Sequence, residues 1–223
     1  MGVYLDKNLS WNFHITELCK KLSCAVGMLY KMKNLCSTST LKAIYHTLFH
    51  SHLSYGISVW GLAKTSLTHK VILLQKKAIH VVAKEDFLAH TDNIFNELKI
   101  IKCSDQYLLS LASLMWDYDH DEIPNSLKSW FKKPNHSYFT RSVKQGKLKP
   151  CDYNTTKFGI HSFRYEGTQL LNELKYEQIY INSKSRKDFT TKLKNEILEP
   201  THLIFKYTLF KVNCITTPFL QSL

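Results

Sequence analysis

Apolar residues recur at alternating steps of four and three along three segments of the first 85 residues, which is the spacing of one face of an α-helix. The first segment begins near Ser10, a plausible N-cap, and places Lys20 and Lys31 opposite its apolar stripe. The second is predicted to begin near residue 39 or 40 and to end at Gly61, and the third covers about 66–84. The three stripes are Trp11, Ile15, Leu18, Leu22, Ala25, Leu29 and Met32, then Leu41, Ile44, Tyr45, Leu48, Tyr55 and Val59, then Leu67, Val71, Leu74, Ala78 and Val81.

Three amphipathic helices with short connections predict a mainly α protein that begins with an antiparallel helix bundle. The spacing is also typical of a coiled-coil dimer, but the stripes are short and the helices have one another to pack against. Residues 2–6 predict a short strand. Two further helices are predicted, one over 104–119 with Tyr107, Leu108, Leu111, Met115 and Tyr118 on one side, and one that begins at Ser185 with Phe189, Leu193 and Ile197 on one face.

The chain changes in character after Pro124, where clear periodicity gives way to aromatic and basic residues. We therefore expect two domains with a boundary near 120–125: a helical bundle with an N-terminal strand over 1–120, and a less regular basic region with a C-terminal helix over 121–223. Residues 201–223 are apolar and β-branched, and they predict either a strand or a frayed tail.

Composition indicates a folded protein with a preference for polyanions. The chain has 223 residues, 44% of them hydrophobic, with a mean hydropathy of −0.24. Its net charge of +12 and pI near 9.3 favour nucleic acid first and an anionic membrane second, although lysines also simply keep a protein soluble. Six scattered cysteines without a CxxC pair predict reduced thiols in an intracellular protein of the nucleus or cytoplasm.

The segment Ala43–Ala63 lacks charged residues and is long enough to span a bilayer. It nevertheless carries several histidines, serines and a threonine, so a buried or amphipathic helix is the better interpretation and no membrane contact is expected.

The acidic residues do not form a polymerase centre. Two-metal nucleotidyl transfer needs paired carboxylates, yet the chain contains no Asp-Asp pair and no tyrosine-any-Asp-Asp hairpin. Nucleophile elbows and glycine-rich phosphate loops are also absent from the sequence. We therefore expect no catalytic residue, cofactor or small-molecule substrate.

Two clusters have metal-binding residue types. Asp117, Asp119, Asp121 and Glu122 resemble a magnesium site less than a solvated helix end, because the spacing lacks a glycine turn. His46 and His50 have the helical spacing that lets two imidazoles share zinc, but no third ligand is evident. His52 falls on the apolar face and is interpreted as a core histidine.

Between Glu122 and Asp152 the sequence contains no acidic residue. Cations neutralise phosphates and aromatic rings stack on unpaired bases, so the segment is a candidate nucleic-acid site. The alternative is a basic surface loop whose rings close the edge of the bundle. The candidate phosphate contacts are Lys132, Lys133, Arg141, Lys144, Lys147 and Lys149, and the candidate stacking residues are Trp130, Phe131, Tyr138 and Phe139.

One block carries a family resemblance: His50-Ser51-His52-Leu53-Ser54-Tyr55-Gly56-Ile57-Ser58-Val59-Trp60-Gly61, followed by Leu74-Gln75-Lys76-Lys77-Ala78-Ile79. With 2–6 and 9–15 upstream, it resembles the region after the palm in reverse transcriptases of LINE-type (jockey-like) retrotransposons. The resemblance implies a thumb, which grips the template–primer duplex through its backbone. By position, the thumb contacts would be Lys20, Lys21, Lys31 and Lys33, with Lys76 and Lys77 as a second set.

The resemblance weakens after about residue 100. Where such tails have a tryptophan between prolines, this chain has Gly167, Thr168, Leu171 and Asn172, which indicates either a diverged lineage or drift in an inactive copy.

We therefore expect a reverse-transcriptase fragment without fingers and palm. It would bind RNA, DNA or their hybrid without sequence preference, pair with a palm-containing polymerase fragment, and not polymerise by itself. The alternatives are a helical protein-interaction module and a pseudogene product that does not fold stably.

Overall fold

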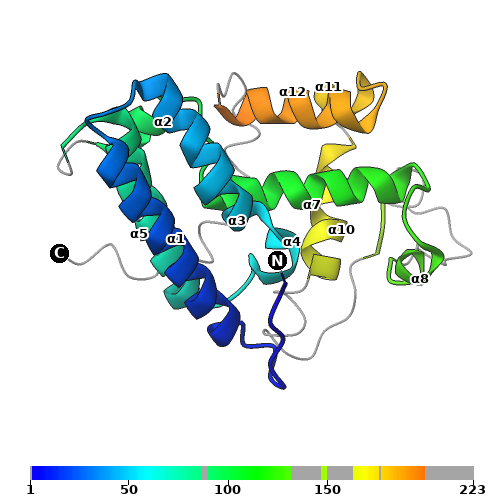
Figure 1. Cartoon of the computed structure of the whole chain (residues 1–223). Helices are drawn as coiled ribbons and strands as arrows, with labels where there is room; N and C mark the ends of the chain where they lie inside the picture. The colour runs from blue at the N-terminus through cyan, green and yellow to red at the C-terminus, as the bar shows by residue number, and fades with distance from the viewer. Residues whose placement is uncertain (1, 87–89, 132–146, 150–162, 176, 199–223) are drawn as a thin grey trace, which may run out of the picture. The chain divides into compact units, whose positions relative to one another are not determined.

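The computed structural model describes residues 2–86, 90–131, 147–149, 163–175 and 177–198 (Figure 1). These residues are mainly helical and contain no β-strand, which confirms the predicted fold class. They divide into two compact units, one before Leu108 and one from Leu108 to Glu196. The domain boundary that the sequence predicts near 120–125 stays a prediction.

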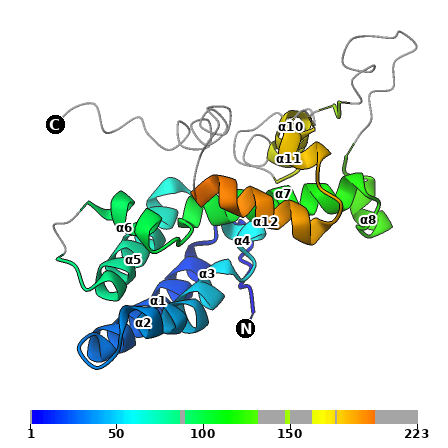
Figure 2. The same cartoon turned by 90° about the horizontal axis from the view of Figure 1, so that it is seen from above.

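The first unit is built on α1 (Asn12–Met32) and α5 (Thr65–Ala83), which lie side by side and run in the same direction (Figures 1 and 2). The chain segment that connects α1 to α5 is a broken helical run, which packs against α1 and runs in the opposite direction to both helices. This up-down-up order is what short connections between amphipathic helices produce. The run consists of α2 (Thr38–Ile44), the π-helix η1 (Tyr45–His50), α3 (Ser51–Ser54) and α4 (Ile57–Trp60), and α6 (Thr91–Glu97) follows α5.

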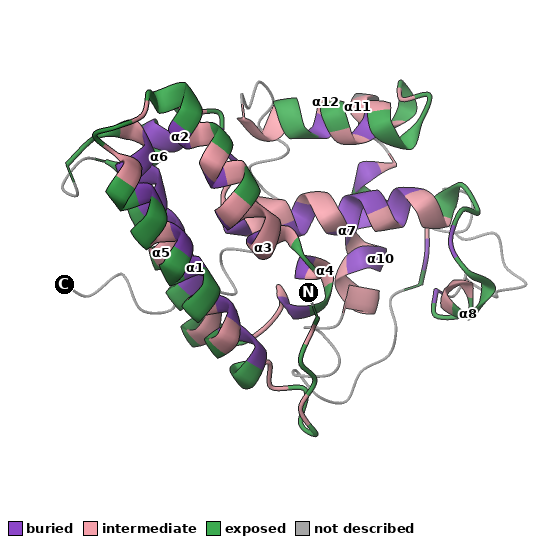
Figure 3. Ribbon diagram, viewed as in Figure 1, coloured by how far each residue is buried: buried purple, intermediate pink, exposed green. Residues whose placement is uncertain are grey.

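The predicted stripe of α1 forms the buried face of that helix, as the alternation of buried and exposed turns shows (Figure 3). The start of the helix differs from the prediction. The residue before Asn12 is Trp11, which has a left-handed backbone (φ 61°) and whose side chain does not cap the helix, although the Asn12 N–H donates to Oγ of Ser10 at 3.4 Å. Ser10 also bonds Asp6: its N–H donates to Oδ1 at 2.7 Å and its hydroxyl donates to Oδ2.

The second predicted helix is interrupted by the π-helix η1, and its buried face therefore differs from the prediction. A step of four residues overshoots an α-helical turn by about 40°. A π turn holds more residues, so four residues fall short of a full turn there. Side chains four apart, whose direction rotates forward along the α-helix, are therefore rotated back at the π turn. Tyr55 and Val59, predicted to be on the apolar face, are 44% and 51% exposed. The buried positions keep a near-constant spacing of four, at Leu41, Tyr45, Phe49, Leu53, Ile57 and Trp60.

Two glycines shape the end of this run. Gly56 has a left-handed backbone (φ 63°) that turns the chain between α3 and α4. Gly61 ends α4, as predicted, and a Cβ there would lie 2.4 Å from Cδ2 of Tyr107 and 2.6 Å from the carbonyl oxygen of Ile57. The helix therefore ends where only a glycine leaves room for the Tyr107 ring.

Residues 2–6 do not form the predicted strand, and no described segment pairs with them. A strand is stable only when its backbone groups pair with a neighbour. Tyr4 packs edge-on against Phe13, with ring centroids 5.1 Å apart, and its N–H lies 3.4 Å from Nδ1 of His14. The N-terminal segment is thus held by side chains of α1.

A buried glutamine joins three parts of the first unit. Gln75 in α5 is 1% exposed, and its amide nitrogen donates to the Tyr45 hydroxyl at 3.0 Å and to the carbonyl oxygen of Ile101 at 2.9 Å. Its amide oxygen accepts from the Cys103 N–H at 2.9 Å. Every buried polar group in this set therefore has a partner, which is the condition under which such groups are tolerated in a core.

α7 (Cys103–Asp119) begins in the first unit and is the central element of the second from Leu108 onward, and its predicted apolar side is buried except for the half-buried Tyr118. Met115 of α7 forms a core cluster with Phe131, Leu148 and Leu171. α12 starts as predicted, because the Asp188 N–H donates to Oγ of Ser185 at 3.2 Å. The other helices of this unit are α8 (Asn125–Lys128), α10 (Phe163–Leu174), α11 (Gln178–Ile181) and α12 (Arg186–Leu198).

Candidate nucleic-acid interface

The thumb lysines predicted on α1 do not form a single patch. Lys20 and Lys31 are exposed on the outer face, where Lys20 pairs with Glu17 at 2.6 Å. Lys21 lies on another side of the helix, close enough to His14 to help lower the pKa of that imidazole, after burial as the main cause. Lys33 is half-buried and follows the last turn of α1.

The predicted pair on α5 is also divided. Both Lys76 and Lys77 are exposed, but consecutive residues point about 100° apart on a helix. Lys76 lies near Asp92, whose pKa is lowered first by Lys102 at 2.7 Å and more weakly by Lys76. Lys77 is thus the member of the pair that faces away from this acidic partner.

Two lysines that the sequence did not single out, Lys70 and Lys84, lie seven residues before and after Lys77. Lys70 and Lys77 are exposed and seven residues apart, a spacing that keeps residues on one side of a helix. Lys84 is exposed too and follows α5 as its C-cap, with a left-handed backbone (φ 62°). We call these three lysines the α5 lysine row. Lys70 lies close enough to Cys19 of α1 to influence the pKa of its thiol, which burial raises. Lys70 therefore lies on the side of α5 next to α1, and Lys77 shares that side of the helix.

Acidic residues do not balance the positive charge of the sequence that runs from α1 to the end of α5. From Leu18 to Lys84 the sequence contains ten lysines and no aspartate or glutamate. None of the lysines in the row forms an ion pair with another described residue. The acid-free stretch and the seven-residue spacing are both visible in the sequence, and together they would have identified the row.

The basic, aromatic segment is described only in part. Trp130 is 44% exposed, with its ring centroid 5.5 Å from that of Phe163. Phe131 is 6% exposed within the core cluster, and this burial favours the alternative in which the ring closes a core. Lys147 is half-buried and Lys149 exposed. The candidates Lys132, Lys133, Tyr138, Phe139, Arg141 and Lys144 lie outside the described residues.

The acidic cluster at the end of α7 is largely exposed, as the interpretation of a solvated helix end expects, and three of its carboxylates also pair with cations of the second unit. Asp119 lies 2.6 Å from Nζ of Lys175, and Asp121 lies 3.0 Å from Nζ of Lys128 in α8. Asp117 is 3.0 Å from Nε of Arg186 in α12, in an ion pair without hydrogen-bond geometry. Burial still raises the pKa of Asp117, and Arg186 opposes that rise. Cations from separate elements thus converge on one helix end.

Neither metal alternative gains support where the structure is described. The rings of His46 and His50 lie edge to face with centroids 5.4 Å apart, and the described residues contain no group of three metal-ligating side chains. Across the same residues, no helix combines the length and apolar character needed to cross a membrane. Cys19, Cys24, Cys36 and Cys103 are free thiols.

Comparison with known proteins supports the resemblance. The chain is 28% identical over 109 residues to the RNA-directed DNA polymerase from mobile element jockey of Drosophila melanogaster, and 24% identical over 109 residues to a probable RNA-directed DNA polymerase from transposon X-element of the same species. This chain is homologous to part of LINE-type retrotransposon reverse transcriptases. A jockey polymerase of Drosophila funebris is 27% identical over 130 residues.

These matches cover only part of each protein. They span 48–57% of this chain but 12–14% of the relatives. No family model matches the chain, and no solved structure does either. The predicted family is therefore confirmed, whereas the assignment of the helices to a thumb stays a prediction.

Proposed function

We propose that this chain is a reverse-transcriptase fragment that binds RNA, DNA or their hybrid through the phosphate backbone, without sequence preference. The observation that carries the proposal is the α5 lysine row, exposed beside α1 in a stretch without acidic residues. Lysines bind phosphate as point charges and release condensed counterions from the nucleic acid. The similarity to RNA-directed DNA polymerases agrees with such a ligand.

Charge removal on α5 tests this proposal. Each phosphate contact contributes about 0.9 to the slope of log K against log salt on duplex DNA. The variant Lys70→Gln/Lys77→Gln should therefore reduce that slope by about 1.8, and should weaken binding about 60-fold near 0.1 M salt. Fluorescence anisotropy with a labelled duplex, repeated at several salt concentrations, measures both quantities.

The chain offers a matched control on α12. Lys187 and Lys194 are also exposed and seven residues apart, so Lys187→Gln/Lys194→Gln removes the same charge from another helix. The control should retain most of the affinity and slope. Equal losses in both variants would show that net charge alone attracts the nucleic acid, and wild-type binding that does not weaken with salt would reject the proposal altogether.

We also propose that the fragment does not polymerise alone and that a palm-containing polymerase fragment is its partner. The sequence has no Asp-Asp pair, and two-metal nucleotidyl transfer needs converging carboxylates. A primer-extension assay with magnesium should give no product from the isolated chain. Extension by the purified chain would overturn this part of the proposal.

A further inference from the structure

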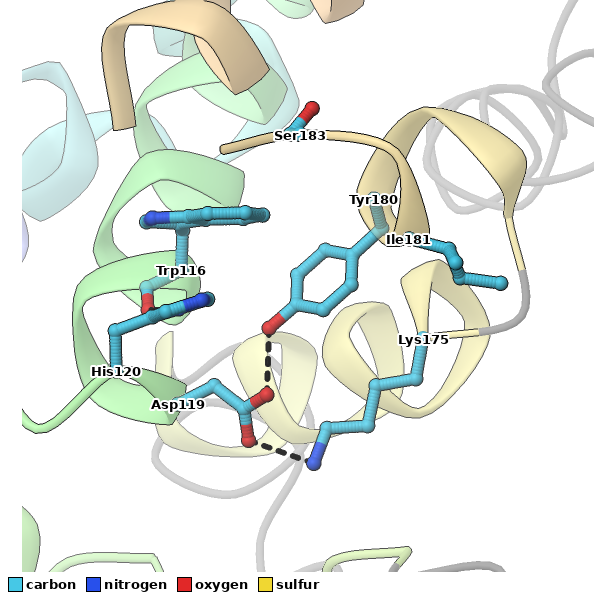
Figure 4. Close-up of a pocket in the computed structure, with 7 residues that line it drawn as sticks. All are labelled: Trp116, Asp119, His120, Lys175, Tyr180, Ile181 and Ser183. Atoms are coloured by element: carbon cyan, nitrogen blue, oxygen red, sulfur yellow. Dashed lines mark hydrogen bonds and ion pairs between the residues drawn. The ribbon is translucent and has the colours of Figure 1, made fainter. Parts of the chain in front are cut away.

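The second unit contains a pocket of about 410 Å³ that the basic surface of α1 and α5 does not involve (Figure 4). Asp119 sits at its centre, where its carboxylate accepts a hydrogen bond from the Tyr180 hydroxyl at 2.6 Å and pairs with the Lys175 ammonium at 2.6 Å. The lining residues are Trp116, Asp119, His120, Lys175, Tyr180, Ile181 and Ser183.

Three aromatic rings form a column that ends at this pocket. Phe189 and Trp116 stack with centroids 4.7 Å apart and planes 18° apart, and Trp116 and His120 stack at 4.0 Å and 17°. Phe189 is fully buried and Trp116 is 3% exposed, whereas His120 is exposed. Because Trp116 covers one face of the imidazole, the exposed surface of His120 belongs to its other face and its edges. The Tyr180 ring lies beside His120, tilted by 49° with centroids 6.3 Å apart, so among the described rings only Trp116 stacks on the imidazole and the column ends at His120.

We propose that this pocket binds an unpaired nucleobase, which stacks on His120 and adds a fourth ring to the column. Planar bases stack on aromatic side chains whatever their sequence, and the cavity is large enough for a base with its sugar. The paired carboxylate of Asp119 offers an acceptor to an exocyclic amine, and Lys175 offers a cation to the adjoining phosphate. The chain's charge of +12 favours a nucleic-acid strand over a cationic peptide as the occupant.

This inference goes beyond backbone binding, because it requires bases and uses different residues. A single-stranded 12-mer and an abasic strand of the same length carry the same phosphates and differ only in their bases. His120→Ala should weaken binding of the 12-mer about fivefold or more, and should leave the abasic strand and the duplex unaffected.

Two substitutions at the same position separate stacking from charge. His120→Phe keeps an aromatic ring and should retain the affinity for the 12-mer, whereas His120→Lys places a cation there without a ring and should lose it. His90→Ala removes another exposed histidine, outside this pocket, and is the matched control for histidine removal. Circular dichroism of each variant shows whether the helices are intact.

The outcomes distinguish this site from the proposed backbone interface. Unchanged 12-mer binding by His120→Ala, or an equal loss for the abasic strand, overturns the nucleobase site while leaving the α5 lysine row untouched. If the wild-type chain binds the duplex and both strands with equal affinity, only the nucleobase site fails. A wild-type chain that binds none of the three rejects both, and displacement of the 12-mer by an aromatic peptide but not by a mononucleotide would assign the pocket to a protein partner.

Discussion

Replacement of Gln75 tests how the first unit is held together. Gln75→Leu keeps a side chain of similar size but removes three hydrogen bonds, to the Tyr45 hydroxyl, the Ile101 carbonyl oxygen and the Cys103 N–H. All three partners belong to buried residues, so water does not replace the lost amide. Each unsatisfied buried group costs about 1–3 kcal/mol. We therefore expect the free energy of unfolding to fall by at least about 3 kcal/mol.

Urea denaturation followed by circular dichroism measures this loss through the midpoint of the transition. Tyr45→Phe removes one of the three bonds and should cost about 1 kcal/mol, since the Gln75 amide keeps its backbone partners. Gln106→Leu makes the same change at a half-buried site in α7 and should cost less than about 0.5 kcal/mol. If Gln75→Leu is no more destabilising than Gln106→Leu, the reasoning about buried polar groups is refuted.

Three further perturbations follow from other contacts. Gly61→Ala, whose Cβ would meet the Tyr107 ring, should lower the melting temperature, whereas Gly27→Ala, where no atom lies within 4 Å, should stabilise α1 by about 0.5–1 kcal/mol. Burial raises the pKa of Asp105 above 3.8, so its ionisation opposes folding, and Asp105→Asn should gain stability over the wild type as pH rises from 3 to 7 in urea titrations. Burial lowers the pKa of His14 below 6.5, so the wild type should lose stability as pH falls through that value, and a pH series of His14→Gln should lack this loss.

Helices with an uninterrupted apolar period were predictable from the sequence. The stripe of α1 and the apolar side of α7 are buried as expected, and Ser185 caps α12 because its spacing to Asp188 is that of a capping residue. In these elements the local pattern and the packing agree, so periodicity alone identifies the buried face.

Other features depend on contacts between distant residues, and the pattern did not contain them. Nothing near Gln75 indicates that its amide meets groups about 30 residues away on either side. The π turn changes which residues face the core and the chain turns at Tyr55 and Gly56, so Tyr55 and Val59 were misplaced although the helical segment itself was found. The seven-residue helix α6 was missed, since few turns give a weak period. The longer α10 was missed because its buried face includes Gly167 and Thr168, which are not apolar markers of a helix.

The family was accessible from the sequence, whereas the role predicted for the lysines on α1 and α5 stays a prediction. The α5 lysine row was accessible too but was overlooked, because attention fell on the adjacent pair Lys76 and Lys77. The His120 column was not accessible, since its rings come from α7, α12 and the residue after α7 and meet only in the folded unit.

The wide turn η1 also bears on how this chain tolerates changes in length. A π turn accommodates one residue more than the regular helix does over the same rise. Loss of one residue among the partly accessible positions 46–48 would convert the turn to ordinary α-helix and leave both flanking ends in place. Lineages of this sequence can therefore gain or lose a residue at this point while Tyr45 and Leu53 keep their positions in the core.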